Sequence, residues 1–257
     1  MPSSLHALVT GASAGIGREF ANILAREGHD LVLVARREPE LSALAAELKE
    51  KYGADSRVIT ADLSKARAVQ TLVKELGPDA QIDVLVNNAG FGGHGAFHER
   101  SRDADLNQIA VNVTALTDLT RQLLPGMVAR HRGRILNVAS TAAFQPGPFM
   151  AVYYATKAYV LSFSEALAEE LSGTGVTVTA LCPGVTTTEF QQVAGVDDIA
   201  LTKGPLAMTP SQVAEAAYKG MVKGKMVVIP GVHNKVGAHA TRFTPTKVLL
   251  KVVRRLH

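Results

Sequence analysis

Tyr153 and Lys157 are four residues apart in the segment YYATK, thirteen residues after Ser140. Side chains at positions i and i+4 of a helix lie on the same face. A lysine ammonium about 4 Å from a phenolate attracts it with roughly 4 kcal/mol at an effective dielectric constant of 20. We therefore expect Lys157 to lower the pKa of Tyr153, so that the phenol can act as a general acid or base near neutral pH, with the serine hydroxyl holding a substrate oxygen. Alone the pair is weak evidence, because ordinary surface helices also contain it.

A glycine-rich turn near the N-terminus has the layout of a phosphate-binding site. The segment LHALVTGASAGIGREFANIL runs from an apolar strand through the turn into a helix. Gly11, Gly15 and Gly17 would let the backbone approach a pyrophosphate, and a helix beginning near Ile16 would direct its free N–H groups at the anion. The spacing differs from the usual dinucleotide fingerprint, and glycine turns also occur without ligands. We nevertheless predict nucleotide binding, because the sequence pattern indicates both the strand before the turn and the helix after it.

The residues after the next apolar run indicate whether the cofactor is NAD or NADP. LVLVA at 31–35 is followed by Arg36 and Arg37. An acidic residue at the strand end would bind the ribose 2′-hydroxyl of NAD, whereas arginine suits the 2′-phosphate of NADP. Ala35 supplies no carboxylate, and Glu38 lies past the strand end. We expect NADP(H), held by Arg36; the alternative is that both arginines are solvated charges.

Composition limits the class of protein. At 257 residues and 47% hydrophobic, the chain can bury one full core, so residues 1–257 are expected to form a single domain. The lone Cys182 indicates a reducing compartment. The first residues do not resemble a secretory signal, and no apolar run is long enough to cross a bilayer, so the cytoplasm is the expected location. A net charge of +4 without tryptophan argues against nucleic acid binding. We expect no metal site.

Short apolar runs alternate with longer helical patterns along the chain. The strands are expected near 5–9, 31–35, 57–60, 83–86, 134–138, 176–181 and 226–229. The helices are expected near 16–27, 39–51, 65–76, 104–131, 154–172 and 211–223. This order predicts an α/β fold: a Rossmann-like, doubly wound parallel sheet of about seven strands with helices on both faces.

Taken together, these motifs resemble the short-chain dehydrogenase/reductase superfamily, from the first strand to about Phe190. TGASAGIG at 10–17 is similar to the family's cofactor turn, Asp62-Leu63 to its adenine contact, NNAG at 87–90 to its central-strand motif, and PGVTTTEF at 183–190 to its nicotinamide loop. One departure is Ala14, where many NADP-using members carry a basic residue. The cofactor contacts that the resemblance implies are Gly11, Ser13, Gly15, Ile16, Gly17, Arg36, Asp62, Leu63, Asn88, Ala89, Gly90, Tyr153, Lys157, Pro183, Gly184 and Thr188.

The resemblance also implies a catalytic set: Asn112, Ser140, Tyr153 and Lys157. It implies hydride transfer between NADP(H) and a carbonyl or secondary alcohol, with Tyr153 as the acid or base and Ser140 bonded to the substrate oxygen. Lys157 would also hold the nicotinamide ribose, and Asn112 would anchor a water. Singly, Ser140 could be a turn cap and Asn112 a backbone-bonded polar residue. The competing class is a catalytically silent NADP(H)-binding regulator on the same fold.

The substrate itself is not specified by the sequence. Residues 190–210 should form a lid whose apolar side chains either line a pocket or pack against the body. These are Phe190, Val193, Val196, Ile199, Leu201, Leu206 and Met208. The loop at 91–99 brings His94, Phe97 and His98 to the expected mouth, where histidines are more often surface residues. An apolar ketone, a 3-oxoacyl thioester or a hydroxysteroid would suit such a pocket.

The C-terminal extension, 234–257, ends in PTKVLLKVVRRLH. As a helix it would place Lys247, Lys251, Arg254 and Arg255 on one side and Leu249, Val252, Val253 and Leu256 on another. Such a helix can lie on an anionic membrane or pack on the body or a neighbouring subunit. The resemblance implies a homodimer or homotetramer, formed through the helices at 104–131 and 154–172.

Overall fold

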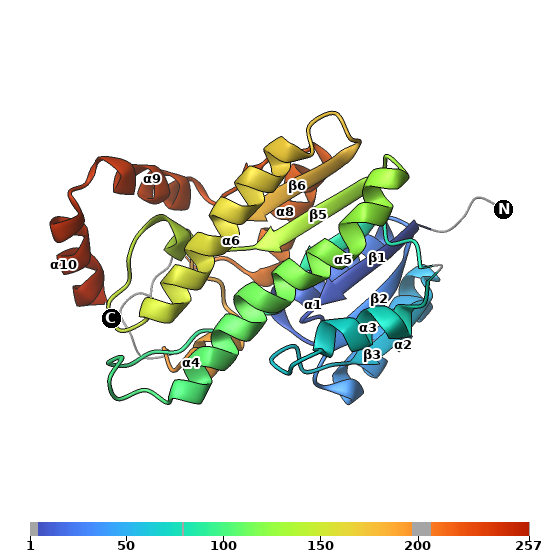
Figure 1. Ribbon diagram of the computed structural model, residues 1–257, viewed down its shortest axis with the longest axis horizontal. Coiled ribbons are helices and arrows are strands. Elements are labelled where there is room, and N and C mark those ends of the chain that lie inside the picture. Colours follow the sequence, from blue (N-terminus) through green and yellow to red (C-terminus); the bar gives the residue numbers. More distant parts are fainter. Residues whose placement is uncertain (1–4, 79, 197–206, 257) are drawn as a thin grey trace.

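A computed structural model describes residues 5–78, 80–196 and 207–256 (Figure 1). Its sheet is parallel throughout, with the strand order β3-β2-β1-β4-β5-β6-β7. The strands are β1 Leu5–Thr10, β2 His29–Ala35, β3 Ser56–Thr60, β4 Val84–Asn87, β5 Gly133–Val138, β6 Val176–Leu181 and β7 Val227–Val228. The expected doubly wound fold is confirmed, although β7 is shorter than the expected 226–229.

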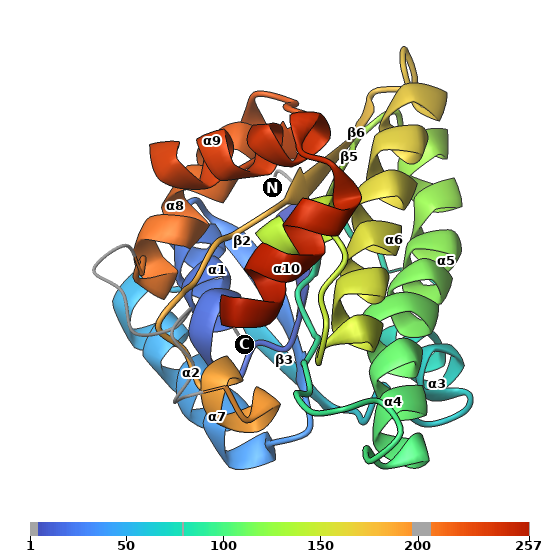
Figure 2. The same cartoon turned by 90° about the vertical axis from the view of Figure 1, so that its left-hand side faces the viewer.

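Helices cover both faces of the sheet, as Figure 2 shows. The α-helices are α1 Gly15–Arg26, α2 Glu38–Tyr52, α3 Ala68–Leu76, α4 Arg102–Ile109, α5 Leu116–Ala129, α6 Ala151–Glu170, α7 Phe190–Ala194, α8 Pro210–Val222, α9 Val232–Ala240 and α10 Thr246–Leu256. Three further turns are the π-helix η1 Ala110–Ala115 and the 3₁₀ segments η2 Thr141–Phe144 and η3 Thr241–Phe243. One face carries α1, α2 and α8, and the other carries α3, α5 and α6.

Alternation along the strands divides the apolar core into two layers. In β2, Leu31 and Leu33 pack towards α1 and α2, whereas Val32 and Val34 pack towards α3 and α5. Successive side chains of a strand point to opposite faces, so a strand covered on both sides must be apolar at nearly every position. This is why the continuous apolar runs of the sequence identified the strands.

Three helices differ from the expectation at their ends or centres. The predicted helix 154–172 begins three residues earlier, at Ala151, and so includes Tyr153. The predicted helix 65–76 begins at Ala68, because Arg67 before it adopts a left-handed conformation with φ of 65°. The predicted helix 104–131 is three segments, since η1 interrupts it between α4 and α5. A π-helical turn within an α-helix often marks a functional position.

The strand order places the site. The chain moves outward from β1 to β3 and then returns to pair β4 on the other side of β1. A cleft opens where the connections diverge, at the carboxyl ends of β1 and β4. Helices α9 and α10 lie beyond the carboxyl ends of β5 and β6, at the left of Figure 1. Among the described helices, none has both the length and the apolar composition that crossing a bilayer requires.

Candidate active site

A single cavity of about 670 Å³ lies at this cleft. It reaches from the end of β2, past the glycine turn, to the start of α6 and the segment before α7. Most of the predicted site residues line it, namely Gly11, Ser13, Gly15, Ile16, Arg36, Asp62, Leu63, Asn88, Ala89, Gly90, Ser140, Tyr153, Lys157, Pro183, Gly184 and Thr188. Gly17 and Asn112 lie behind the lining. The sequence therefore located the cavity, whereas the roles of its residues remain predictions.

The glycine turn requires glycine for two reasons. Gly11 and Gly15 have positive φ values of 65° and 55°, which side chains rarely adopt. A Cβ atom at Gly11 would lie 2.8 Å from the Asn88 side-chain amide, and one at Gly17 would collide with the Gly11 carbonyl oxygen. The backbone is thus packed tightly on β4 and leaves its outer side bare. Ala14 gives the start of α1 no side-chain cap, so the first N–H groups of the helix face the cavity side uncapped.

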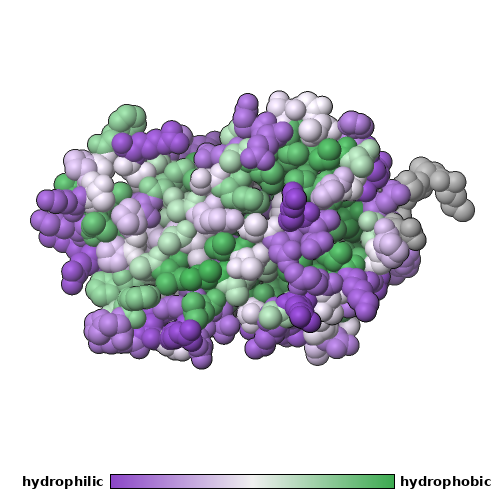
Figure 3. Space-filling model, viewed as in Figure 1, coloured by the Kyte–Doolittle hydropathy of each residue, from purple (hydrophilic) through white to green (hydrophobic). Residues whose placement is uncertain are grey.

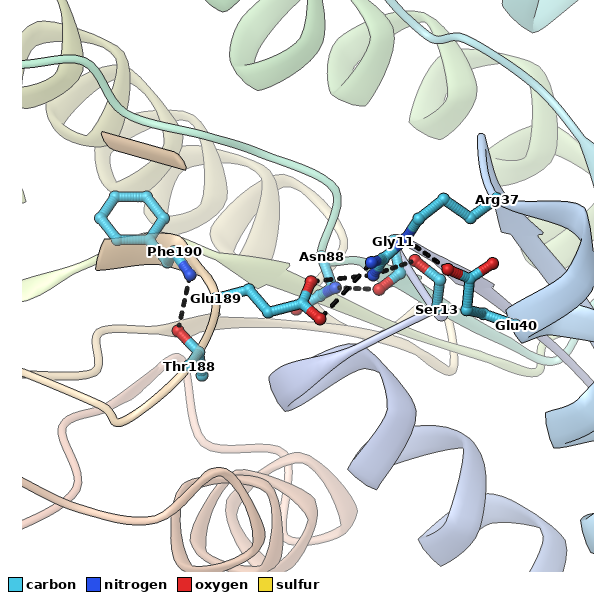
Figure 4. Close-up of polar contacts among 8 residues, drawn as sticks. All are labelled: Gly11, Ser13, Arg37, Glu40, Asn88, Thr188, Glu189 and Phe190. Carbon is cyan, nitrogen blue, oxygen red and sulfur yellow. Dashed lines mark hydrogen bonds and ion pairs between the residues drawn. The ribbon is translucent and has the colours of Figure 1, made fainter. Parts of the chain in front are cut away.

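Asn88 and Thr10 fasten β1 to β4 beneath this turn. The Thr10 hydroxyl accepts hydrogen bonds from the backbone N–H groups of Asn88 and Ala89, at 3.0 Å each. The Asn88 side chain donates to the carbonyl of Thr10, at 3.0 Å, and to that of Gly11, at 3.1 Å; the bond to Gly11 is drawn in Figure 4. These bonds hold the floor of the cavity in one conformation. A bare turn, uncapped helix N–H groups and the cavity volume together fit a dinucleotide.

Two arginines stand at the end of the cavity beside β2. Arg36 is exposed and its charge is one of the influences on Asp62. Burial alone would raise the pKa of Asp62, but hydrogen bonds from Ser64 and the charges of Lys65 and Arg36 outweigh it and lower that pKa. Arg37 forms an ion pair with Glu189, at 2.9 Å. We expected Arg36 to bind the 2′-phosphate. In the structure both Arg36 and Arg37 line the cavity, and Arg37 is paired with the Glu189 carboxylate.

Glu189 lies in the predicted nicotinamide loop at 183–190 but was not among the predicted cofactor contacts. Its partner Arg37 also donates to the Ser13 hydroxyl, at 3.2 Å, and lies 3.5 Å from Glu40 (Figure 4). The same loop approaches the glycine turn at Thr188, whose methyl group would be 3.1 Å from a Cβ at Gly15. The loop after β6 therefore contacts both the glycine turn and the residues that follow β2.

Ser140 and Tyr153 meet at the other end of the cavity. Ser140 precedes η2 and accepts a hydrogen bond from the Ala142 N–H, at 3.1 Å, as a turn cap would. Its hydroxyl also hydrogen-bonds Tyr153. The Tyr153 ring is half-buried, because it borders the cavity. Loss of hydration around the hydroxyl nevertheless raises the pKa of Tyr153 to about 12, and the hydrogen bond with Ser140 opposes that rise.

The predicted effect of Lys157 on this pKa is wrong in the structure. Tyr153 and Lys157 do share a face of α6, but the Lys157 ammonium is 5.8 Å from the centre of the Tyr153 ring. It donates to the Val138 carbonyl at the end of β5, at 2.7 Å. Burial lowers the pKa of Lys157 to about 8 and outweighs the opposing influence of Cys182. Desolvation therefore determines both pKa values, and the expected 4 Å ion pair is replaced by a bond to the backbone.

Asn112 lies within η1 and braces the cavity wall from behind. Its side chain accepts from the Phe91 N–H, at 3.1 Å, and donates to the Phe91 carbonyl, at 3.0 Å. It donates to the Thr156 hydroxyl as well, at 3.1 Å. At 1% exposure, Asn112 lies behind Gly90 with its amide nitrogen and oxygen both hydrogen-bonded, and its role in anchoring a water remains a prediction.

The cavity end beside Tyr153 is apolar. Phe190 lies 5.3 Å from the Tyr153 ring, measured between ring centres, and both belong to a cluster with Met150, Ala194 and Val196. Of the other predicted lid residues, Met208 packs against the main core instead. Ile199, Leu201 and Leu206 lie outside the described residues, as does the side chain of Val193.

The loop at 91–99 contributes surface residues more than cavity lining. Phe97 is 68% exposed, and the His98 side chain lies beside Glu99 on the surface. His94 packs its ring against Phe149. Two polar residues that the sequence did not signal, Gln145 and Asn234, do line the cavity. Gln145 is hydrogen-bonded to Tyr154.

Comparison with known proteins agrees with this geometry. The family model of short chain dehydrogenases matches residues 5–198. A very-long-chain 3-oxoacyl-CoA reductase of Laccaria bicolor is 43% identical over 177 residues, which are 67% of this chain and 52% of that protein. An inactive hydroxysteroid dehydrogenase-like protein 1 of Pongo abelii is 35% identical over 179 residues, 69% of this chain and 54% of its own. The chain thus spans about half the length of these relatives.

Among solved structures, a short-chain dehydrogenase from Sphingobium yanoikuyae in complex with NADPH superposes with a TM-score of 0.85. It is 36% identical, and the match covers 95% of each chain. With the parallel sheet, the glycine turn and the matched residues in agreement, the chain belongs to the short-chain dehydrogenase family of oxidoreductases.

Proposed function

We propose that the protein is an NADP(H)-dependent oxidoreductase that interconverts a carbonyl and a secondary alcohol on an apolar substrate. The observation that carries the proposal is one cavity lined at one end by the bare glycine turn and Arg36, and at the other by Ser140 and Tyr153. The first end suits a dinucleotide phosphate, and the second can donate a proton to an oxygen.

The chemistry of the proposed reaction divides between cofactor and protein. A bound nicotinamide would supply or accept the hydride. Tyr153 would donate its hydroxyl proton to the carbonyl oxygen, and the Ser140 hydroxyl would hydrogen-bond the same oxygen. Burial raises the pKa of Tyr153 to about 12, so the phenol is protonated at neutral pH, as an ordinary phenol also is, and would enter a reduction as the proton donor. Lys157 uses one N–H on Val138 and has two left for ribose hydroxyls.

The apolar cluster beside Tyr153 supports the substrate class. Phe190, Met150 and Val196 would contact a hydrocarbon portion better than a sugar or an ion. The matched relatives named for 3-oxoacyl-CoA and hydroxysteroid substrates are consistent with that choice. We propose an apolar ketone, a 3-oxoacyl thioester or a hydroxysteroid.

A second function, NADP(H) binding without turnover, is favoured by two observations. One relative is named inactive, and the Lys157 ammonium is bound to Val138 rather than close to the phenol. A panel of these carbonyls, and of the matching alcohols, separates the two functions. Consumption of NADPH with any carbonyl, or formation of NADPH from NADP⁺ with any alcohol, supports the enzyme. Tight NADPH binding with neither reaction across the panel supports the silent regulator.

Self-association and location complete the proposal. Leu106, Ile109 and Tyr159 are exposed on α4 and α6. Figure 3 shows hydrophobic side chains gathered over this part of the molecule. We propose that this face forms the interface of a homodimer or homotetramer. Light scattering would test this, because Tyr159→Glu should lower the molar mass.

We also propose a cytoplasmic location, in keeping with the free, buried thiol of Cys182.

A further inference from the structure

The C-terminal helices expose an unusual amount of apolar surface. Five of the eleven large apolar side chains that are exposed in the described residues lie between Val232 and Val252. They occupy α9, η3 and α10, at one end of the molecule (Figures 1 and 2). Their exposed fractions are 77% for Val232, 64% for Val236, 87% for Phe243, 50% for Val248 and 51% for Val252.

On each helix these side chains lie opposite the packed face. In α10, Leu249 and Val253 pack into the apolar cluster beside Tyr153, and Val253 is only 2% exposed. Val248 and Val252 are four residues apart and share the other face. The sequence grouped Val252 with Leu249 and Val253 on one side of this helix, whereas in the structure Val252 lies on the exposed face with Val248.

Helix α9 shows the same division. Ala238 is buried against the body, whereas Val232 and Val236 are four residues apart on the exposed side. Both helices thus direct branched apolar groups outward.

Positive charge accompanies this apolar surface. Residues 231–257 hold six of the 27 lysines and arginines and none of the 23 aspartates and glutamates, so the rest of the chain is net negative. Lys251 and Arg255 are exposed on the same face of α10 as Val248 and Val252. Arg254 is partly engaged, with its guanidinium 5.5 Å from the centre of the Phe149 ring. In Figure 3 hydrophilic and hydrophobic side chains are mixed at this end.

We propose that α9, η3 and α10 form a docking surface for an anionic lipid bilayer, on which the protein lies as a peripheral protein. Interleaved basic and apolar side chains bind at the headgroup boundary, where the cations meet phosphates and the apolar groups enter the acyl region. A second copy is a poor occupant, because a two-fold contact would set this basic segment against itself. An acidic protein would neutralise the basic side chains, but it offers no continuous apolar layer for the exposed apolar side chains of α9, η3 and α10.

Docking in this way has a consequence for the cavity. The inner face of α10 packs into one apolar cluster with Met150, Ala194 and Val196, and two of these residues, Met150 and Val196, line the cavity. A bilayer on the outer face of α10 would therefore lie one helix away from the place where an apolar substrate is expected to bind.

Vesicle co-sedimentation of the full chain tests the docking surface. The protein should sediment with vesicles of phosphatidylcholine and phosphatidylglycerol, sediment much less with phosphatidylcholine alone, and be released as salt screens the charges. Lys251→Glu with Arg255→Glu should weaken binding at least about tenfold. Lys223→Glu with Lys225→Glu is the matched control. It makes the same change in net charge on exposed residues near α8 and should leave binding unchanged.

A second pair of variants tests the apolar half. Val248→Ser with Val252→Ser should also weaken binding to the anionic vesicles, without changing the circular dichroism spectrum, because both side chains are exposed. The proposal is overturned if the wild-type chain does not sediment, or if the matched control loses binding equally. It is also overturned if the serine variant changes the molar mass while vesicle binding persists, which would assign the face to a second copy. Unchanged vesicle binding by the serine variant, with loss of an acidic protein from a pull-down, would assign it to that protein.

Discussion

The guanidinium of Arg37 and the carboxylate of Glu189 form an ion pair of 2.9 Å that joins two walls of the cavity. Arg37 follows β2, next to Arg36, which is expected to bind the 2′-phosphate, and Glu189 directly precedes Phe190. Phe190 in turn contacts Tyr153. A carboxylate bound to an arginine at this place competes with a phosphate for the same N–H donors.

Replacing Glu189 with Gln should therefore tighten the binding of NADPH. The pair is exposed on both sides, so its contribution is small, about 0.2–1 kcal/mol, or roughly fivefold in affinity at most. NADH lacks the 2′-phosphate and should bind equally to both proteins. Titration calorimetry with each nucleotide measures the difference. Glu47→Gln, which breaks the similar surface pair with Arg18 away from the cavity, is the control and should leave both affinities unchanged. Weaker NADPH binding by Glu189→Gln would mean that Glu189 assists the cofactor.

Arg36→Ala should weaken NADPH binding far more than NADH binding. Hydrogen bonds to charged groups contribute about 1.5–3 kcal/mol, which corresponds to roughly ten- to hundredfold in the dissociation constant. Fluorescence titration of the two nucleotides provides the comparison. Lys65→Ala, another basic residue lining the same end of the cavity, tests whether general positive charge suffices. Equal losses of both nucleotides in Arg36→Ala would remove the 2′-phosphate argument.

The sheet was predictable because its signal is local. Runs such as 31–35 are apolar on both faces only when helices cover both sides, so their composition already specifies a central strand. The glycine turn was equally predictable, because Gly11 and Gly15 have positive φ values that other residues rarely adopt.

What the sequence did not predict depends on contacts between distant segments. Lys157 bonds to Val138, nineteen residues earlier, and Arg37 pairs with Glu189, 152 residues later. The π-helix around Asn112 coincides with bonds to Phe91, on another loop. Helical spacing shows which face Tyr153 and Lys157 share, but desolvation and competing partners determine their pKa values.

Tyr153→Phe tests the proposed acid. The substitution keeps the ring that packs against Phe190 and removes only the hydroxyl, so NADPH should still bind. Carbonyl turnover should fall by roughly a hundredfold or more, the usual loss when acid–base assistance is removed. Tyr154→Phe, at the adjacent buried position, should retain most activity, since its hydroxyl bonds Gln145. Near wild-type turnover by Tyr153→Phe would refute the assignment, provided that steady-state rates are compared at saturating NADPH.

The buried ammonium of Lys157 should leave a signature in the pH dependence of stability. Its pKa falls from 10.5 to about 8 on folding, because burial disfavours the charge. Between these values the unfolded chain holds a proton that the folded chain has released, so this group makes stability rise with pH over that interval. The difference of pKa corresponds to roughly 3 kcal/mol as an upper limit. Urea unfolding of wild type and Lys157→Met at pH 8 and above isolates the effect. Their difference in free energy of unfolding should shift in favour of wild type as pH increases. A difference that stays constant over the interval would show that Lys157 keeps its ordinary pKa in the folded protein.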